Sequence, residues 1–95
     1  MIKRIVKLTF QEERVSDFLA LFERTHQHIR AFPGCNHLEL LRGTDQPNVF
    51  FTYSYWDGPE ALENYRHSAL FKGTWKETKK LFSDKPKAWS VEQLY

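Results

Sequence analysis

The chain has 95 residues, of which 41% are hydrophobic and 27% are charged, a composition typical of one globular domain spanning residues 1–95. Its formal net charge of +2 is too small to indicate nucleic acid or an anionic membrane as a partner. The single cysteine, Cys35, excludes an internal disulfide, and no apolar run reaches the ~18 residues of a membrane helix, so we expect a soluble cytoplasmic protein.

The first half of the chain predicts a strand, a helix and a second strand. Apolar side chains alternate over Ile2–Phe10 and share one face, on which Arg4 is the exception. Over about Glu12–Ala31 the apolar residues change to helical spacing. The predicted apolar stripe contains Val15, Phe18, Leu19, Phe22, His26 and Ile29. Pro33 ends this helix, and the second strand is expected over Cys35–Arg42.

The second half predicts a strand, an interrupted helix and a last strand. Val49–Trp56 has aromatic or apolar residues on both faces, which indicates a central strand. Pro59 suits the first position of a helix, whose apolar spacing breaks around residues 67–69. The stripe beyond the break contains Phe71, Trp75 and Phe82, and Pro86 is expected to end that segment. The last strand is predicted over Ala88–Tyr95.

This order of elements predicts the α+β class, as a ferredoxin-like βαββαβ sandwich with an antiparallel sheet and both helices on one face. Ile5 and spare aromatic residues of the later strands would then lie on the uncovered face of the sheet. Because large exposed apolar surfaces on single chains usually mark interfaces, we expect a second copy to cover it. The predicted assembly is a homodimer.

The stretch WDGPEALENYRHSALF, residues 56–71, resembles the antibiotic biosynthesis monooxygenase family of small dimeric α+β barrel proteins. The resemblance covers the whole chain in element order and is most specific at Trp56, Glu60, Ala61, Ser68 and Phe71. Two positions depart from the family pattern, because Tyr65 and Leu70 stand where many relatives have histidines. The resemblance implies a ferredoxin-like fold that pairs into a dimeric α+β barrel.

One branch of this family degrades haem with an asparagine, a tryptophan and an iron-ligating histidine. The resemblance matches those positions to Val6, Tyr65 and Trp75, and indole offers no lone pair to iron, so haem degradation is not expected. The family implies instead that no metal or other cofactor is used to oxygenate an electron-rich aromatic, such as a quinol or phenolic polyketide, with dioxygen. That reaction needs a dry pocket, a base and a donor for the substrate anion.

Within this chemistry the predicted catalytic residues are His26, Tyr65 and Trp75. His26 lies on the apolar stripe of the first helix, and imidazole accepts protons near neutral pH. Tyr65 and Trp75 are expected on the inner side of the second helix, where they could sandwich a planar substrate while Tyr65 donates its hydroxyl to an oxyanion. The alternatives are a hydrogen-bonded core histidine and ordinary aromatic core packing. The predicted substrate-binding residues are Val6, Phe22, Arg66, His67 and Phe71.

Three other groups of residues have side chains of the types that bind metal ions or anions. Cys35, His37 and Glu39 share one face of the second predicted strand and are possible zinc or iron ligands, but no second cluster completes the set, so no metal is predicted. His26 and His28 point away from each other on a helix and cannot share an ion. The lysines of the last helix are interpreted as a solvated face: Lys72, Lys76, Lys79 and Lys80.

Two non-enzymatic functions fit the same topology. RNA-recognition domains stack bases on the third strand, but NVFFTYSYW contains no basic residue and the first strand offers only Phe10, at its end. A dimeric module that binds or senses a small molecule without oxygenating it stays open. The replacements at Tyr65 and Leu70 favour that alternative.

Overall fold

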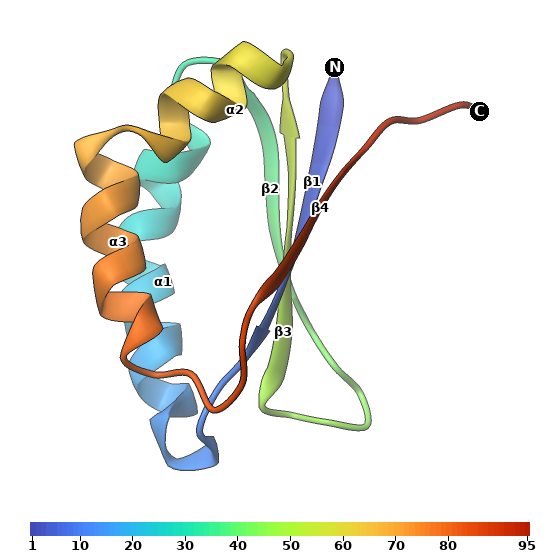
Figure 1. Ribbon diagram of the computed structural model, residues 1–95. Coiled ribbons are helices and arrows are strands. Elements are labelled where there is room, and N and C mark those ends of the chain that lie inside the picture. Colours follow the sequence, from blue (N-terminus) through green and yellow to red (C-terminus); the bar gives the residue numbers. More distant parts are fainter.

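The α-helices all lie on one face of a single antiparallel sheet (Figure 1). A computed structural model describes residues 1–95. The elements are β1 (Ile2–Thr9), a 3-10 turn (Glu12–Arg14), α1 (Val15–Arg30), β2 (Cys35–Arg42), β3 (Val49–Trp56), α2 (Pro59–Arg66), α3 (Ala69–Lys79) and β4 (Lys87–Val91). The strands lie in the order β2-β3-β1-β4, and every neighbouring pair is antiparallel. This is the predicted ferredoxin-like arrangement.

The two inner strands, β1 and β3, carry different side chains on their two faces. Arg4 lies opposite Ser54, and residues directly opposite each other in a sheet share a face. Ser54 is buried beneath the helices, so Arg4 also starts on the helical side. Ile5 lies opposite Tyr53 and starts on the other side. β3 is a central strand between β1 and β2, as predicted.

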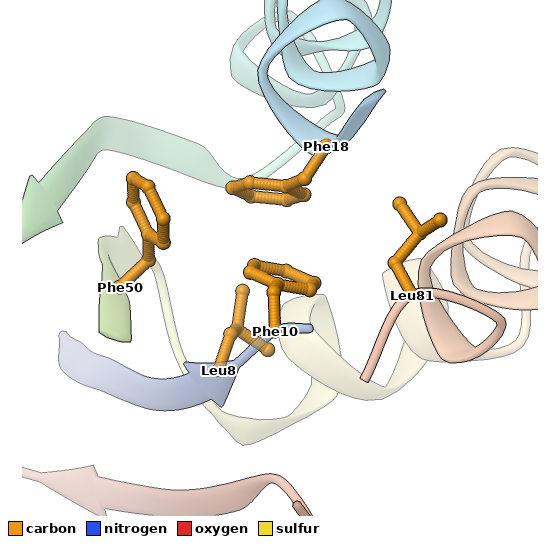
Figure 2. Close-up of a cluster of buried hydrophobic side chains, with 5 residues drawn as sticks. All are labelled: Leu8, Phe10, Phe18, Phe50 and Leu81. Atoms are coloured by element: carbon orange, nitrogen blue, oxygen red, sulfur yellow. The ribbon is translucent and has the colours of Figure 1, made fainter. Parts of the chain in front are cut away.

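The core consists of two clusters near opposite ends of β3. The larger contains Leu8, Phe10, Phe18, Phe50 and Leu81. Figure 2 shows Phe18 reaching from α1 onto Phe10, and their ring centroids are 4.1 Å apart. The smaller contains Cys35, Trp56 and Leu62, where β3 turns into α2. The clusters fix the helices at the two ends of the sheet.

α1 differs from the predicted helix in the residue at which it begins and in one residue of its predicted apolar stripe. Glu12–Arg14 form a separate 3-10 turn, and α1 begins at Val15. Phe18 and Leu21 are buried, whereas Leu19 is exposed, so the prediction of Leu19 in the stripe was wrong. One residue turns about 100° around a helix, which carries Leu19 off the face that Phe18 buries, while three residues return close to it.

The predicted interruption of the second helix is confirmed. α2 ends at Arg66 and α3 begins at Ala69. Ser68 lies between them as the N-cap of α3: its Oγ accepts a hydrogen bond from the Phe71 N–H at 3.1 Å and donates one to the Tyr65 carbonyl at 2.6 Å. One hydroxyl therefore joins the end of α2 to the start of α3.

The chain beyond α3 departs from the prediction at two points. The helix ends at Lys79, so Phe82 lies outside it and forms an isolated antiparallel bridge with Phe10. The last strand covers Lys87–Val91 rather than 88–95. Val91 pairs with Lys3, and β1 itself begins one residue earlier, so residues 92–95 have almost no partner strand to join.

β2 contains a bulge between Cys35 and His37. Cys35 packs in the core against Trp56, whereas His37 lies opposite Tyr55 on the open face with Glu39. The prediction that Cys35, His37 and Glu39 share one face was therefore wrong. A bulge inserts an unpaired residue, which reverses the faces of the residues that follow it.

Gly34 sets the approach of α2 to the turn after α1. Its φ of 88° is in the left-handed region that favours glycine. A Cβ at this position would lie 2.5 Å from the Cβ of Ala61. The Gly34 carbonyl also accepts a hydrogen bond from the Asp57 N–H at 2.9 Å. A side chain here would push α2 away from the sheet.

The face of the sheet opposite the helices is uncovered in the single chain, and Figure 1 shows no helix on that side. Leu41, Trp89 and Val91 on the strands are 41–46% exposed. Only 13 of the 95 residues are buried, because one layer of helices covers one face alone. None of the α-helices combines the length and apolar composition needed to cross a membrane.

Candidate functional site

A cavity of about 320 Å³ lies between the sheet and the helices. It extends from Leu8 and Phe18 of the larger core cluster to Trp56 and Leu62 of the smaller one. Between these ends the inner face of the central strands carries small side chains such as Thr52, which leave the space unfilled. Small-molecule sites occupy roughly 300–1,000 Å³, so the cavity has the volume of a small ligand site.

Four aromatic rings, one from the end of β3 and three from α2 and α3, form a continuous wall of this cavity. Trp56 and Tyr65 stack with centroids 4.9 Å apart, Tyr65 meets Phe71 edge-on at 5.2 Å, and Phe71 stacks on Trp75 at 5.7 Å. All four residues line the cavity. Phe71 contacts both Tyr65 and Trp75, so the four rings form one connected row.

The cavity gathers most of the residues that the sequence singles out. Its lining includes Val6, Phe22, Tyr65, Arg66, Phe71 and Trp75. His26 and His67 are not part of it. His67 is 73% exposed in its side chain, and its Nδ1 lies 2.9 Å from the Glu63 carbonyl. The structure places these residues, and their predicted roles stay predictions.

His26 lies next to a lining residue without lining the cavity itself. Its ring stacks on Phe22 with centroids 5.6 Å apart and an angle of 11° between the planes, and the side chain is half-buried. Phe22 lines the cavity, whereas His26, one helical turn further along α1, does not. Bases are often displaced from their working positions before substrate binds, and a base can act through one water. A base role for His26 needs one of these two routes.

Tyr65 is held as a neutral phenol. Burial raises its pKa well above the ordinary value of 10.0, and the nearby Cys35 thiol adds to the effect. A phenol that keeps its proton can donate a hydrogen bond but cannot act as a base near neutral pH. The environment of Tyr65 therefore suits the predicted donor role.

Arg4 is a lining residue that the sequence marked only as an exception in an apolar strand face. Its Nη1 donates to the Ser90 Oγ at 3.0 Å on β4. Burial lowers the pKa of Arg4, and the positive charge of Arg66 lowers it further. Both guanidinium-bearing residues line the same cavity.

The lining contains no Asp, Glu, His or Cys. Its neutral polar groups include Ser54, which accepts a hydrogen bond from the Trp56 Nε1–H at 2.9 Å, and Thr78, which donates to the Thr74 carbonyl at 2.7 Å. These groups are already hydrogen-bonded within the chain. The other polar residues of the lining are Tyr65, the two arginines, Thr52, Thr74 and Lys87.

The ligand types considered for a metal site do not gather in the fold. Cys35 is in the core, and burial raises the pKa of its thiol. His37 and Glu39 pair on the open face, with Nε2 and Oε2 2.5 Å apart. No three His, Cys, Asp or Glu side chains lie together in an arrangement that could hold an ion.

Known proteins resemble the chain in sequence and fold. The family model described as antibiotic biosynthesis monooxygenase matches residues 1–77. A crystal structure of an antibiotic biosynthesis monooxygenase has a TM-score of 0.93 at 17% identity, with 100% of both chains covered. A conserved protein from Methanosarcina mazei Go1 has a TM-score of 0.92 at 15% identity, covering 97% of this chain and 91% of its own. No curated protein matches the sequence significantly.

A third structure, a candidate antibiotic biosynthesis monooxygenase from Nitrosomonas europaea, has a TM-score of 0.89 at 20% identity, and the match covers 100% of both chains. At such identities these structures establish the fold alone. The ferredoxin-like α+β assignment thus rests on the strand order seen here and on three whole-length structural matches.

Proposed function

The chain belongs to the antibiotic biosynthesis monooxygenase family, and we propose that it oxygenates a small electron-rich aromatic, of the quinol or phenolic polyketide type, without a cofactor. The observation that carries the proposal is the apolar cavity walled by Trp56, Tyr65, Phe71 and Trp75. A wall of four aromatic rings suits a planar aromatic ligand. The cytoplasm is the proposed location, which the lone cysteine supports.

In the proposed reaction a phenol loses its proton and the resulting anion supplies electrons to dioxygen. One oxygen atom replaces the hydrogen of a ring carbon and becomes a carbonyl. The other oxygen leaves as water with the two hydrogen atoms that the phenol loses, one from its hydroxyl and one from the ring. The product is a quinone, and no external reductant is consumed.

The chain's own groups would assist this reaction by stabilising charge and excluding water. The Tyr65 hydroxyl would donate to the substrate oxygen. Arg4 and Arg66 would favour the phenolate, because nearby positive charge lowers the pKa of a bound phenol. Trp75 would complete the apolar wall. His26, whose ring stacks on Phe22, is the proposed proton acceptor.

We also propose that the active assembly is a homodimer. The exposed apolar side chains of the open sheet face, Leu41, Trp89 and Val91 among them, support it. The contact would be isologous, with the same surface of each copy in the interface. A second copy would bury these side chains without closing the cavity on the helical face.

A binding or sensing module is the second candidate function. The observation that favours it is the absence of any Asp, Glu, His or Cys from the cavity lining, which leaves no base in direct contact with a ligand. Such a module would bind the same aromatic ligands but would not consume oxygen. The two candidates therefore differ in one measurable reaction.

Oxygen consumption with 1-naphthol and related phenols distinguishes them. We expect the native chain to consume oxygen and to produce the quinone only in air, with one labelled oxygen atom incorporated from ¹⁸O₂. We expect His26→Ala to lower the rate by about 10²–10⁴-fold, the usual value of a general base. His28→Ala is the matched control, because His28 is exposed on the same helix and its loss should leave the rate unchanged.

Phenol binding without oxygen consumption would establish the binding module and reject the oxygenase. A loss below tenfold in His26→Ala, with oxygenation intact in the native chain, would assign His26 to packing against Phe22 rather than to proton transfer. Circular dichroism of both histidine variants should be native-like, so that the rates are compared between folded proteins.

A further inference from the structure

The charged side chains at the cavity are all of one sign. The whole chain has 14 Lys and Arg against 12 Asp and Glu, yet the lining includes Arg4, Arg66 and Lys87 and no carboxylate. Lys87 lies opposite Lys7 in the sheet, so its side chain starts on the open face, on the side away from the helices. Two guanidinium groups therefore remain at an apolar, aromatic space.

Arg4 has no carboxylate partner within 4.0 Å, although it is half-buried. Its one side-chain partner is the neutral Ser90 hydroxyl. A guanidinium has five N–H donors in a fixed fork that fits a carboxylate, so most of the donors of Arg4 are not used within the chain. Burying such a group without an anion is costly, and a bound anion would offset that cost.

Arg66 is the second residue with a guanidinium group in the cavity lining. Its Nη1 donates to Glu63 Oε1 at 2.7 Å, along the exposed side of α2. Glu63 also lies 3.7 Å from His67 and does not line the cavity. It is the one carboxylate whose charge acts on Arg4, raising the pKa that burial and Arg66 lower. Glu63 therefore competes with a bound anion for Arg66 from the outer side.

We propose that the ligand of this cavity is a planar aromatic acid, whose ring lies along the Trp56–Trp75 wall and whose carboxylate binds between Arg4 and Arg66. Tyr65 neighbours Arg66 in the chain and links this charged end to the aromatic wall. The inference rests on the proposed aromatic ligand and narrows its class to anionic aromatics. It does not depend on whether that ligand is oxygenated.

The test compares 2-naphthoate with 2-naphthamide, which match in ring and size and differ in charge. Isothermal titration of the whole chain in low-salt buffer should show 2-naphthoate binding about ten- to a hundredfold more tightly, the contribution of hydrogen bonds to a charged group. Added salt should reduce the preference, because the site is partly open to solvent.

Variants assign the preference to the two arginines. Arg4→Gln and Arg66→Gln should each lower 2-naphthoate affinity about tenfold, and the double variant should bind both probes equally. Arg24→Gln removes the same charge from an exposed position on α1 and should change nothing. Glu63→Gln should tighten 2-naphthoate binding about two- to fivefold by removing the competing carboxylate.

Equal affinity of the native chain for the two probes would overturn the inference, as would a preference that persists in the double variant. The absence of binding by both probes would also overturn it. Neither probe has the phenol that the proposed oxygenation requires, so this result is separate from the oxygen assay. Oxygenation of 1-naphthol without any preference for 2-naphthoate would leave the proposed function standing and reject the aromatic acid.

Discussion

Tyr65 shows how one residue can have a role that its sequence position does not specify. The sequence marks it as a departure from the family, where many relatives have a histidine. The fold buries it between Trp56 and Phe71, which keeps the phenol neutral. A histidine at this position could exchange protons near neutral pH, whereas a protonated tyrosine can donate a hydrogen bond but cannot act as a base there. The replacement thus removes a base and retains a donor.

The raised pKa of Tyr65 predicts how stability changes at high pH. Below pH 10 the Tyr65 phenol is protonated in both the folded and the unfolded state, so it does not make the free energy of unfolding depend on pH. Above pH 10 the unfolded state loses the proton first, so the free energy of unfolding should fall by about 1.4 kcal/mol per pH unit from this group. Tyr65→Phe should remove that part of the decline in urea unfolding measured between pH 9 and 11.

Tyr95→Phe is the control for this measurement, because Tyr95 is fully exposed and its phenol has the same surroundings before and after unfolding. Its slope should equal that of the native chain. Equal slopes for Tyr65→Phe and Tyr95→Phe would contradict the burial of the Tyr65 hydroxyl in solution.

At the scale of elements, the break between α2 and α3 shapes the cavity wall. A continuous helix would carry Tyr65 and Phe71 on a fixed helical spacing, about 240° apart around the axis, and they would diverge. The break at residues 67–68 lets both rings line the same space. Ser68 stabilises this geometry through two hydrogen bonds: its Oγ accepts one from the Phe71 N–H and donates one to the Tyr65 carbonyl.

Ser68→Ala should therefore destabilise the fold and weaken the site together. Loss of an N-cap costs about 1 kcal/mol, within a range of about 0.5–2 kcal/mol, which chemical denaturation at fixed protein concentration can measure. Binding of the aromatic ligand should weaken as well, because Tyr65 and Phe71 flank the cap. Ser83→Ala is the control, since the Ser83 hydroxyl makes no hydrogen bond in the chain. Unchanged stability in Ser68→Ala would show that water replaces the cap.

At the scale of the whole molecule, a single chain leaves its sheet half covered. The helices bury one face, and the other presents Leu41, Trp89 and Val91 to solvent. Lys3 lies over the Tyr55 ring at 4.5 Å on the same face, so the surface is a mixture of apolar and cationic groups rather than a uniform apolar patch. Such a surface is typical of an interface with a polar rim.

We expect light scattering to give twice the mass of the chain, which is 11.4 kDa. Trp89→Glu should shift the protein toward monomer, because it places a charge without a partner on the open face. Leu19→Glu is the control, as Leu19 is similarly exposed on α1, away from that face. A native chain with monomer mass, or a Trp89→Glu variant with dimer mass, would contradict the interface.

The sequence predicted most of the architecture because local rules decide it. Alternation indicates the strands, and Pro33 and Pro59 mark helix limits. The slip in spacing near residue 67 indicates the break, which the structure confirms. These features depend on neighbours in the chain, so periodicity and turn chemistry are sufficient to find them.

The site depends on contacts between residues far apart in the chain, and these contacts exist only in the folded molecule. The bulge at residue 36 separated Cys35 from His37, and His26 was found outside the cavity lining, stacked on Phe22. Arg4 was visible in the sequence as one cation in an apolar pattern, but only the fold shows that Arg66, 62 residues later, lines the same cavity. A cavity is the space that side chains from several elements leave unfilled, and no single stretch of sequence encodes it.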